Sequence, residues 1–75
     1  MKITVQVFGS LRELAGGSKK ELKLPEGANV SDAIAASGLE DKVDLWVLQN
    51  GKRAGRKEEI KDGDVLTFFQ PVGGG

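Results

Sequence analysis

Apolar and polar residues alternate in the first and last parts of the chain. Ile3, Val5 and Val7 recur at every second position, and the run 64–69 reads Asp-Val-Leu-Thr-Phe-Phe. A period of two with β-branched and aromatic side chains predicts strands that each bury one face. These two runs have the strongest strand-forming content, so we expect them to lie side by side in the centre of a sheet.

Two further segments predict strands. Residues 20–24 alternate, which would point both of their leucines inward, and residues 45–49 form an apolar run. Asn50-Gly51 follows directly, and this dipeptide is the strongest short signal for a hairpin. We therefore expect a weak further strand to begin at Lys52.

The longest helical pattern follows residue 29. Asn29 can cap a helix, Asp32 stands three residues later, and Gly38 is a plausible end. The apolar stripe of this helix would be formed by Val30, Ala33, Ile34 and Leu39.

A shorter helix is predicted between the first two strands. Ser10 and Glu13 have the spacing of a capping box, and Leu11 and Leu14 would give the apolar side. Because strands predominate and one main helix must cover their sheet, we predict an α+β fold for residues 1–70, followed by a glycine tail at 71–75.

The composition limits the chemistry available to side chains. The 75 residues contain no Cys, His or Tyr. Nucleophilic catalysis usually pairs Ser, Cys or Thr with His, and metal sites usually use Cys and His. We therefore expect neither a self-sufficient enzyme nor a metal site.

The charge and hydropathy of the chain limit the classes of partner that it can bind and its expected cellular location. Lys and Arg total 11, and so do Asp and Glu, so the basic excess typical of nucleic-acid binding is missing. No apolar stretch is long enough for a signal peptide or a membrane span. We expect a cytoplasmic protein that binds neither nucleic acid nor membrane.

The tail is the most unusual segment of the sequence. Pro71 and Val72 precede Gly73, Gly74 and Gly75 directly after the last predicted strand. Glycine has few steric limits, so this arm could enter a passage too narrow for side chains. We predict that the reactive group is the main-chain carboxylate of Gly75, on an arm that spans roughly 17 Å when extended.

A tail of this kind needs a docking surface beside it. Ordering three glycines costs roughly 3–6 kcal/mol, which contacts elsewhere must offset. In the last strand, Leu66 and Phe68 share one face, which we assign to the core. Phe69 lies on the other face, and with Trp46 or Leu48 it is our candidate for a partner-binding patch.

Several motifs together resemble a known family. They are the segment 7–16 (VFGSLRELAG), Leu-Pro-Glu-Gly at 24–27, Asn50-Gly51, Lys-Asp-Gly-Asp at 61–64 and the ending Phe-Gln-Pro-Val-Gly-Gly-Gly at 69–75. In this order they resemble the MoaD/ThiS family of sulfur carriers, which implies a ubiquitin-like β-grasp fold with a mixed sheet of four to five strands. The helix at 11–15 favours the MoaD branch, the small subunit of molybdopterin synthase. The three final glycines also occur among ThiS-like proteins, and Gln70 stands where MoaD-like chains often have proline.

The resemblance implies a defined chemistry. An adenylating enzyme of the MoeB/ThiF type would activate the Gly75 carboxylate with ATP, and sulfide or a persulfide from a sulfur donor protein would then give a thiocarboxylate. In the MoaD-like interpretation, the tail enters a MoaE-like large synthase subunit and donates sulfur to a pterin precursor of the molybdenum or tungsten cofactor. The chain itself would bind no cofactor. Two alternatives stay open, namely a ThiS-like carrier for thiamine thiazole synthesis and a ubiquitin-like modifier joined to lysines.

Overall fold

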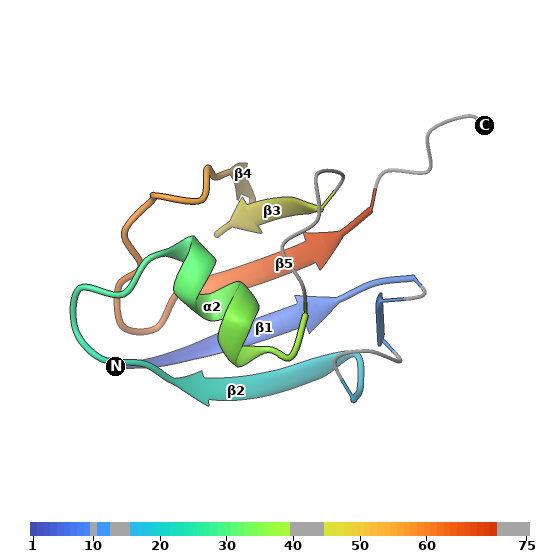
Figure 1. Ribbon diagram of the computed structural model, residues 1–75, viewed down its shortest axis with the longest axis horizontal. Helices are drawn as coiled ribbons and strands as arrows, with labels where there is room; N and C mark the ends of the chain where they lie inside the picture. Colours follow the sequence, from blue (N-terminus) through green and yellow to red (C-terminus); the bar gives the residue numbers. More distant parts are fainter. Residues whose placement is uncertain (10, 13–15, 40–44, 71–75) are drawn as a thin grey trace.

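The computed structural model describes residues 1–9, 11–12, 16–39 and 45–70. Five strands form one sheet in the order β2-β1-β5-β3-β4 (Figure 1). Their bounds are β1 Lys2–Val7, β2 Lys19–Lys23, β3 Trp46–Gln49, β4 Lys52–Arg53 and β5 Val65–Phe69. The central pair β1 and β5 is parallel and every other pair is antiparallel. The predicted central position of the first and last strands is confirmed.

The helix α2, Val30–Ala36, lies across one face of the sheet (Figure 1). Alternate strand positions point toward it and fill the core, which includes Ile3, Val5, Val7, Leu24, Val47, Leu66 and Phe68. The predicted stripe Val30, Ala33, Ile34 and Leu39 is buried in the same core. Of the two leucines predicted to point inward from β2, Leu24 is buried and Leu22 is half-buried against the core.

The ends of α2 follow the sequence signals. Asp32 N–H donates to Asn29 Oδ1 at 3.0 Å, and Asn29 N–H donates to Asp32 Oδ2 at 2.9 Å, which completes the predicted capping box. Gly38, just beyond the C-cap Ser37, has a φ of 81°. Lys20 of β2 adds a contact that the sequence did not predict, because its Nζ donates to the Ser37 carbonyl at 3.3 Å.

The turn between β3 and β4 explains the register of this hairpin. Asn50 and Gly51 have φ values of 52° and 87°. Positive φ at both central residues is typical of a type I′ turn, whose twist matches that of the flanking strands. The predicted hairpin and the weak strand beginning at Lys52 are therefore confirmed.

The predicted short helix after β1 is described only in part. Leu11 and Arg12 are helical, and Leu11 is buried. Ser10, Glu13 and Leu14 lie outside the described residues. In the part of the chain that the structure describes, no helix is long and apolar enough to cross a membrane.

Candidate docking site on the open face of the sheet

The face of the sheet opposite α2 carries the second set of alternating side chains. Strand pairing places Gln6 beside Thr67, Thr67 beside Leu48, and Phe69 beside Trp46. Residues paired directly across neighbouring strands share a face, so these side chains form rows across the sheet. We call this surface the open face.

The three predicted patch residues lie together on the open face. The rings of Trp46 and Phe69 have centroids 6.0 Å apart and planes tilted by 50°, and both side chains are half-buried. Leu48 lies two positions from Trp46 on β3 and is also half-buried. By contrast, Leu66 and Phe68 are fully buried, which confirms their assignment to the core.

Phe8 extends this patch, although it was not among the residues predicted for the site. Its side chain is 55% exposed, and it is the exposed large hydrophobic residue in the described part of the chain. Phe8 N–H donates to the Phe68 carbonyl at 3.1 Å, which continues the parallel ladder between β1 and β5. One position beyond the pair Val7–Phe68, this ladder aligns Phe8 with Phe69. We define Phe8, Phe69 and Trp46 as the aromatic row.

The signal for Phe8 was present in the sequence. Phe8 follows the buried Val7 and continues the alternation of β1, so its position belongs to the solvent-facing set. An aromatic residue at such a position exposes apolar area that a partner can cover. The strand alternation alone could have placed it on the open face.

Arg53 borders the aromatic row. Its guanidinium carbon lies 3.9 Å from the Trp46 ring centroid. A cation over a tryptophan face is stabilised by about 0.5–1 kcal/mol at an exposed site. Arg53 reaches Trp46 because the tight turn at 50–51 returns β4 beside β3, where Leu48 pairs with Arg53. This contact was not predicted from the sequence.

A buried carboxylate fixes the strand that leads to the tail. Asp64 directly precedes β5 and is 9% exposed. Its side chain accepts hydrogen bonds from Gln49 Nε2 at 2.8 Å, Asn50 Nδ2 at 2.9 Å and Lys61 N–H at 2.9 Å. Burial acts to raise the pKa of Asp64, but these hydrogen bonds and the Lys61 charge outweigh it and lower the pKa below the ordinary value of 3.8. The network joins the β3–β4 hairpin to the start of β5.

The aromatic row stands at the end of β5 from which the tail departs. β5 ends at Phe69 and is followed by the half-buried Gln70. The predicted tail residues Pro71, Val72, Gly73, Gly74 and Gly75 lie outside the described residues. No group of three or more His, Cys, Asp or Glu side chains that could hold a metal ion occurs in the described residues.

Comparison with known proteins first gives the class of fold. A small archaeal modifier protein from Haloferax volcanii has a TM-score of 0.83, with 27% identity over 95% of this chain and 98% of the other. A protein from Pyrococcus furiosus described as a molybdopterin converting factor, subunit 1, has a TM-score of 0.82, with 34% identity over 95% of this chain and 98% of the other. The predicted β-grasp, ubiquitin-like fold is confirmed.

The sequence comparison then gives the family. The ThiS family matches residues 5–75, so the chain belongs to the ThiS/MoaD family of sulfur carriers. The molybdopterin synthase sulfur carrier subunit of Chlamydomonas reinhardtii is 31% identical over an alignment of 83 residues that covers both chains fully. The resemblance stated from the sequence motifs is confirmed, and with it the prediction of a carrier subunit in place of a catalytic one.

Proposed function

We propose that this chain carries sulfur as a thiocarboxylate on Gly75 and donates it in molybdopterin synthesis. The observation that carries the proposal is the family match, which runs through the glycine tail to residue 75. The similarity to a molybdopterin synthase sulfur carrier subunit supports the pterin route.

The proposed chemistry uses the main chain. The Gly75 carboxylate attacks the α-phosphate of ATP on an adenylating enzyme and releases pyrophosphate. Sulfide then attacks the acyl carbon and AMP leaves with the bonding electron pair, which gives the thiocarboxylate. When the nucleophile is a persulfide on a donor protein, the product is an acyl disulfide, and a thiol of the donor must cleave its S–S bond to release the thiocarboxylate and leave a disulfide on the donor. The chain contains no Cys, so the sulfur must come from outside it, as sulfide or from a sulfur donor protein.

We propose that the aromatic row and Leu48 dock the body of the protein on the large synthase subunit. Phe69 and Trp46 keep their apolar rings half-exposed on the open face, and Phe8 is 55% exposed. Burial contributes about 25 cal/mol per Å² of apolar surface, so covering on the order of 200 Å² would contribute about 5 kcal/mol. That is similar to the roughly 3–6 kcal/mol that ordering three glycines costs.

Intact mass spectrometry tests the proposal. After incubation with the cognate adenylating enzyme, ATP and a sulfur source, we expect the mass to rise by the difference between one sulfur and one oxygen atom. A matched control omits ATP and should show no change. If the complete reaction leaves the mass unchanged with active cognate enzymes, the proposed function is wrong.

The modifier alternative has an observation in its favour. The Haloferax volcanii protein with a TM-score of 0.83 is named a small archaeal modifier protein. In conjugation, a lysine amine of another protein would attack the same adenylate, so formation of the adenylate does not separate the two functions. Proteomic detection of the tryptic remnant of this chain, residues 62–75, on lysines of other proteins, lost when Gly75 is deleted, would support the modifier function.

The thiazole alternative is favoured by the ThiS description of the family. The thiazole route and the pterin route can be separated by offering the purified thiocarboxylated protein to the synthase of each pathway, because each sulfur acceptor has its own synthase. We expect sulfur transfer with the molybdopterin synthase large subunit. Transfer only with thiazole synthase would overturn the pterin assignment and leave the carrier role intact.

A further inference from the structure

The open face has a strong excess of positive charge, although the formal net charge of the whole chain is zero. Strand pairing and alternation place four cationic side chains on this face and one acidic side chain, Glu21, an excess of three positive charges. The four cations are Lys2, Lys19, Lys23 and Arg53.

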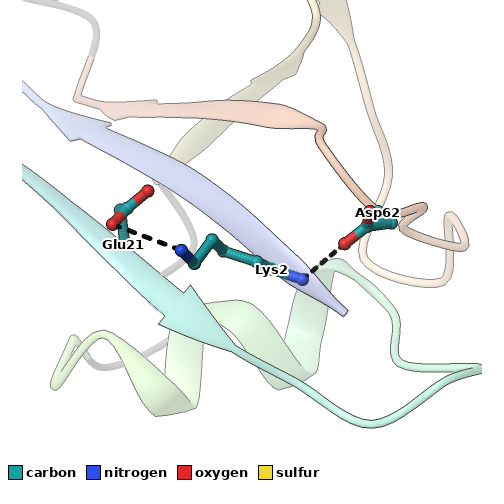
Figure 2. A network of polar contacts seen from close by, with 3 residues as sticks. All are labelled: Lys2, Glu21 and Asp62. Atoms are coloured by element: carbon teal, nitrogen blue, oxygen red, sulfur yellow. Dashed lines mark hydrogen bonds and ion pairs between the residues drawn. The ribbon is translucent and has the colours of Figure 1, made fainter.

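One of these cations is already paired. Lys2 Nζ lies 3.9 Å from Glu21 Oε1, while the Lys2 backbone N–H donates to Asp62 Oδ1 at 2.7 Å (Figure 2). In the described part of the chain, this is the only ion pair on the open face. Lys19, Lys23 and Arg53 form no ion pair with any other described residue.

Two of these three cations stand at opposite edges of one row. Lys19 pairs with Gln6, Gln6 with Thr67, Thr67 with Leu48, and Leu48 with Arg53. This row crosses all five strands beside the aromatic row. Neighbouring strands are about 4.8 Å apart, so the Cα atoms of Lys19 and Arg53 are separated by roughly 19 Å. The two cations thus bracket the apolar surface.

The side chains of Arg53 and Lys19 differ in how firmly they are held. Arg53 is held over the Trp46 ring at 3.9 Å, so a carboxylate that meets it finds an oriented guanidinium. Lys19 is exposed at the start of the edge strand β2, and its ammonium group forms no ion pair with the other described residues. We therefore expect Arg53 to give geometric specificity, whereas Lys19 acts as a mobile point charge.

Several carboxylates of the described residues lie away from the open face or are already engaged. Asp32 caps α2, and Asp64 is buried in its hydrogen-bond network. Glu58 and Glu59 belong to the segment beside the N-terminus of α2, where Val30 N–H donates to the Glu58 carbonyl and Asn29 bridges Glu59. Among the described residues, the excess of positive charge is therefore a property of the open face.

We propose that the open face recognises an acidic surface on a partner protein. That surface has an apolar hollow at its centre and a carboxylate cluster on either side, one of which meets Lys19 and the other Arg53. The occupant is the large synthase subunit, so the inference rests on the proposed function and deepens it. Charge complementarity speeds association and selects among partners more than it adds affinity. Arg53 and Lys19 are positioning residues here, since the sulfur chemistry takes place at Gly75.

Association kinetics test this inference. The rate constant for binding to the purified large subunit from the same organism is measured by stopped-flow fluorescence between about 0.05 and 0.5 M NaCl, where screening becomes strong. We expect Arg53→Gln and Lys19→Gln each to lower the low-salt rate about 1.5- to 5-fold, the range for exposed ion pairs. These differences should disappear at high salt.

Two further variants separate charge from structure. Arg53→Lys keeps the charge and should restore most of the salt dependence. Lys57→Gln removes one charge from the exposed segment beside α2, where Ser31 N–H donates to the Arg56 carbonyl, and should leave the rate unchanged. All variants are first compared with the wild type by circular dichroism to confirm that they fold.

The outcomes of this experiment are distinct from those of the mass measurement. A wild-type rate that is independent of salt, or Lys57→Gln as slow as Arg53→Gln, would overturn the inference. Normal sulfur loading without any binding to the large subunit would also overturn it while leaving the carrier function intact. Failure of loading itself would instead count against the proposed function.

Discussion

Replacing Asp64 by Asn tests whether the buried carboxylate holds the β3–β4 hairpin against β5. In the wild type, Oδ2 accepts from Gln49 Nε2 and Lys61 N–H, and Oδ1 accepts from Asn50 Nδ2. An asparagine at residue 64 can keep an oxygen at only one of these two positions. Its amide group then faces a donor at the other position, so at least one hydrogen bond is lost.

The expected cost follows from these contacts. A hydrogen bond to a charged group contributes about 1.5–3 kcal/mol. For a domain of this size, 1 kcal/mol shifts the melting temperature by about 4–8 °C, so Asp64→Asn should lower it by roughly 6–24 °C at neutral pH. The free energy of unfolding of small domains is only about 5–15 kcal/mol, which makes this loss easy to measure.

The pH dependence gives a second signature. The pKa of Asp64 is lowered in the folded state, so its ionised form stabilises the fold above the ordinary value of 3.8. That stabilisation is lost as the pH falls from 3.8 through the lower folded-state pKa. The difference between wild type and Asp64→Asn should therefore be complete at neutral pH and shrink in this acidic range.

Urea denaturation followed by circular dichroism at several pH values measures both signatures. Glu26→Gln is the matched control, because it removes one negative charge at an exposed position in the turn before α2. Equal stability of wild type and Asp64→Asn at neutral pH would refute the structural role of Asp64. So would a difference that grows as the pH falls below 3.8.

Three further predictions concern docking, the helix cap and the tail. Phe69→Ala should raise the Kd for the large subunit more than about fivefold, because it removes the centre of the aromatic row. The control Val65→Ala, on the same face, should not. Equal Kd values for the two variants by calorimetry would contradict this prediction. Asn29→Ala should destabilise the fold by about 1 kcal/mol, since the capping box is lost. Ser31→Ala serves as the control. An unchanged melting temperature for Asn29→Ala would contradict this prediction. Gly74→Val should abolish sulfur transfer in single-turnover assays without changing the melting temperature, and full transfer would disprove the narrow-passage argument.

The sequence predicted the elements whose signals are local. The alternation in β1 and β5, the Asn29–Asp32 capping box and the Asn50-Gly51 turn each depend on residues within a few positions of one another. The core assignment of Leu66 and Phe68 followed from the same alternation, and both are fully buried. The central pairing of β1 with β5 was inferred from their composition and was also correct.

The contacts that the sequence did not reveal depend on strands that are distant along the chain. Arg53 lies over Trp46 only because of how the hairpin folds back, so its position within a basic run gave no sign of the contact. Lys20 reaches the C-terminus of α2 from the edge strand β2. Phe8 differs from these two residues. Its place in the alternating pattern of β1 could be read from the sequence, but its alignment with Phe69 depends on the register between the parallel strands β1 and β5.

Locating the transferred sulfur within the chain tests the central claim most directly. The loaded protein is fragmented intact in the mass spectrometer, and each backbone fragment is weighed. We predict that only fragments containing Gly75 carry the added sulfur, on the terminal carboxyl group. Sulfur on a fragment that lacks Gly75 would contradict the account.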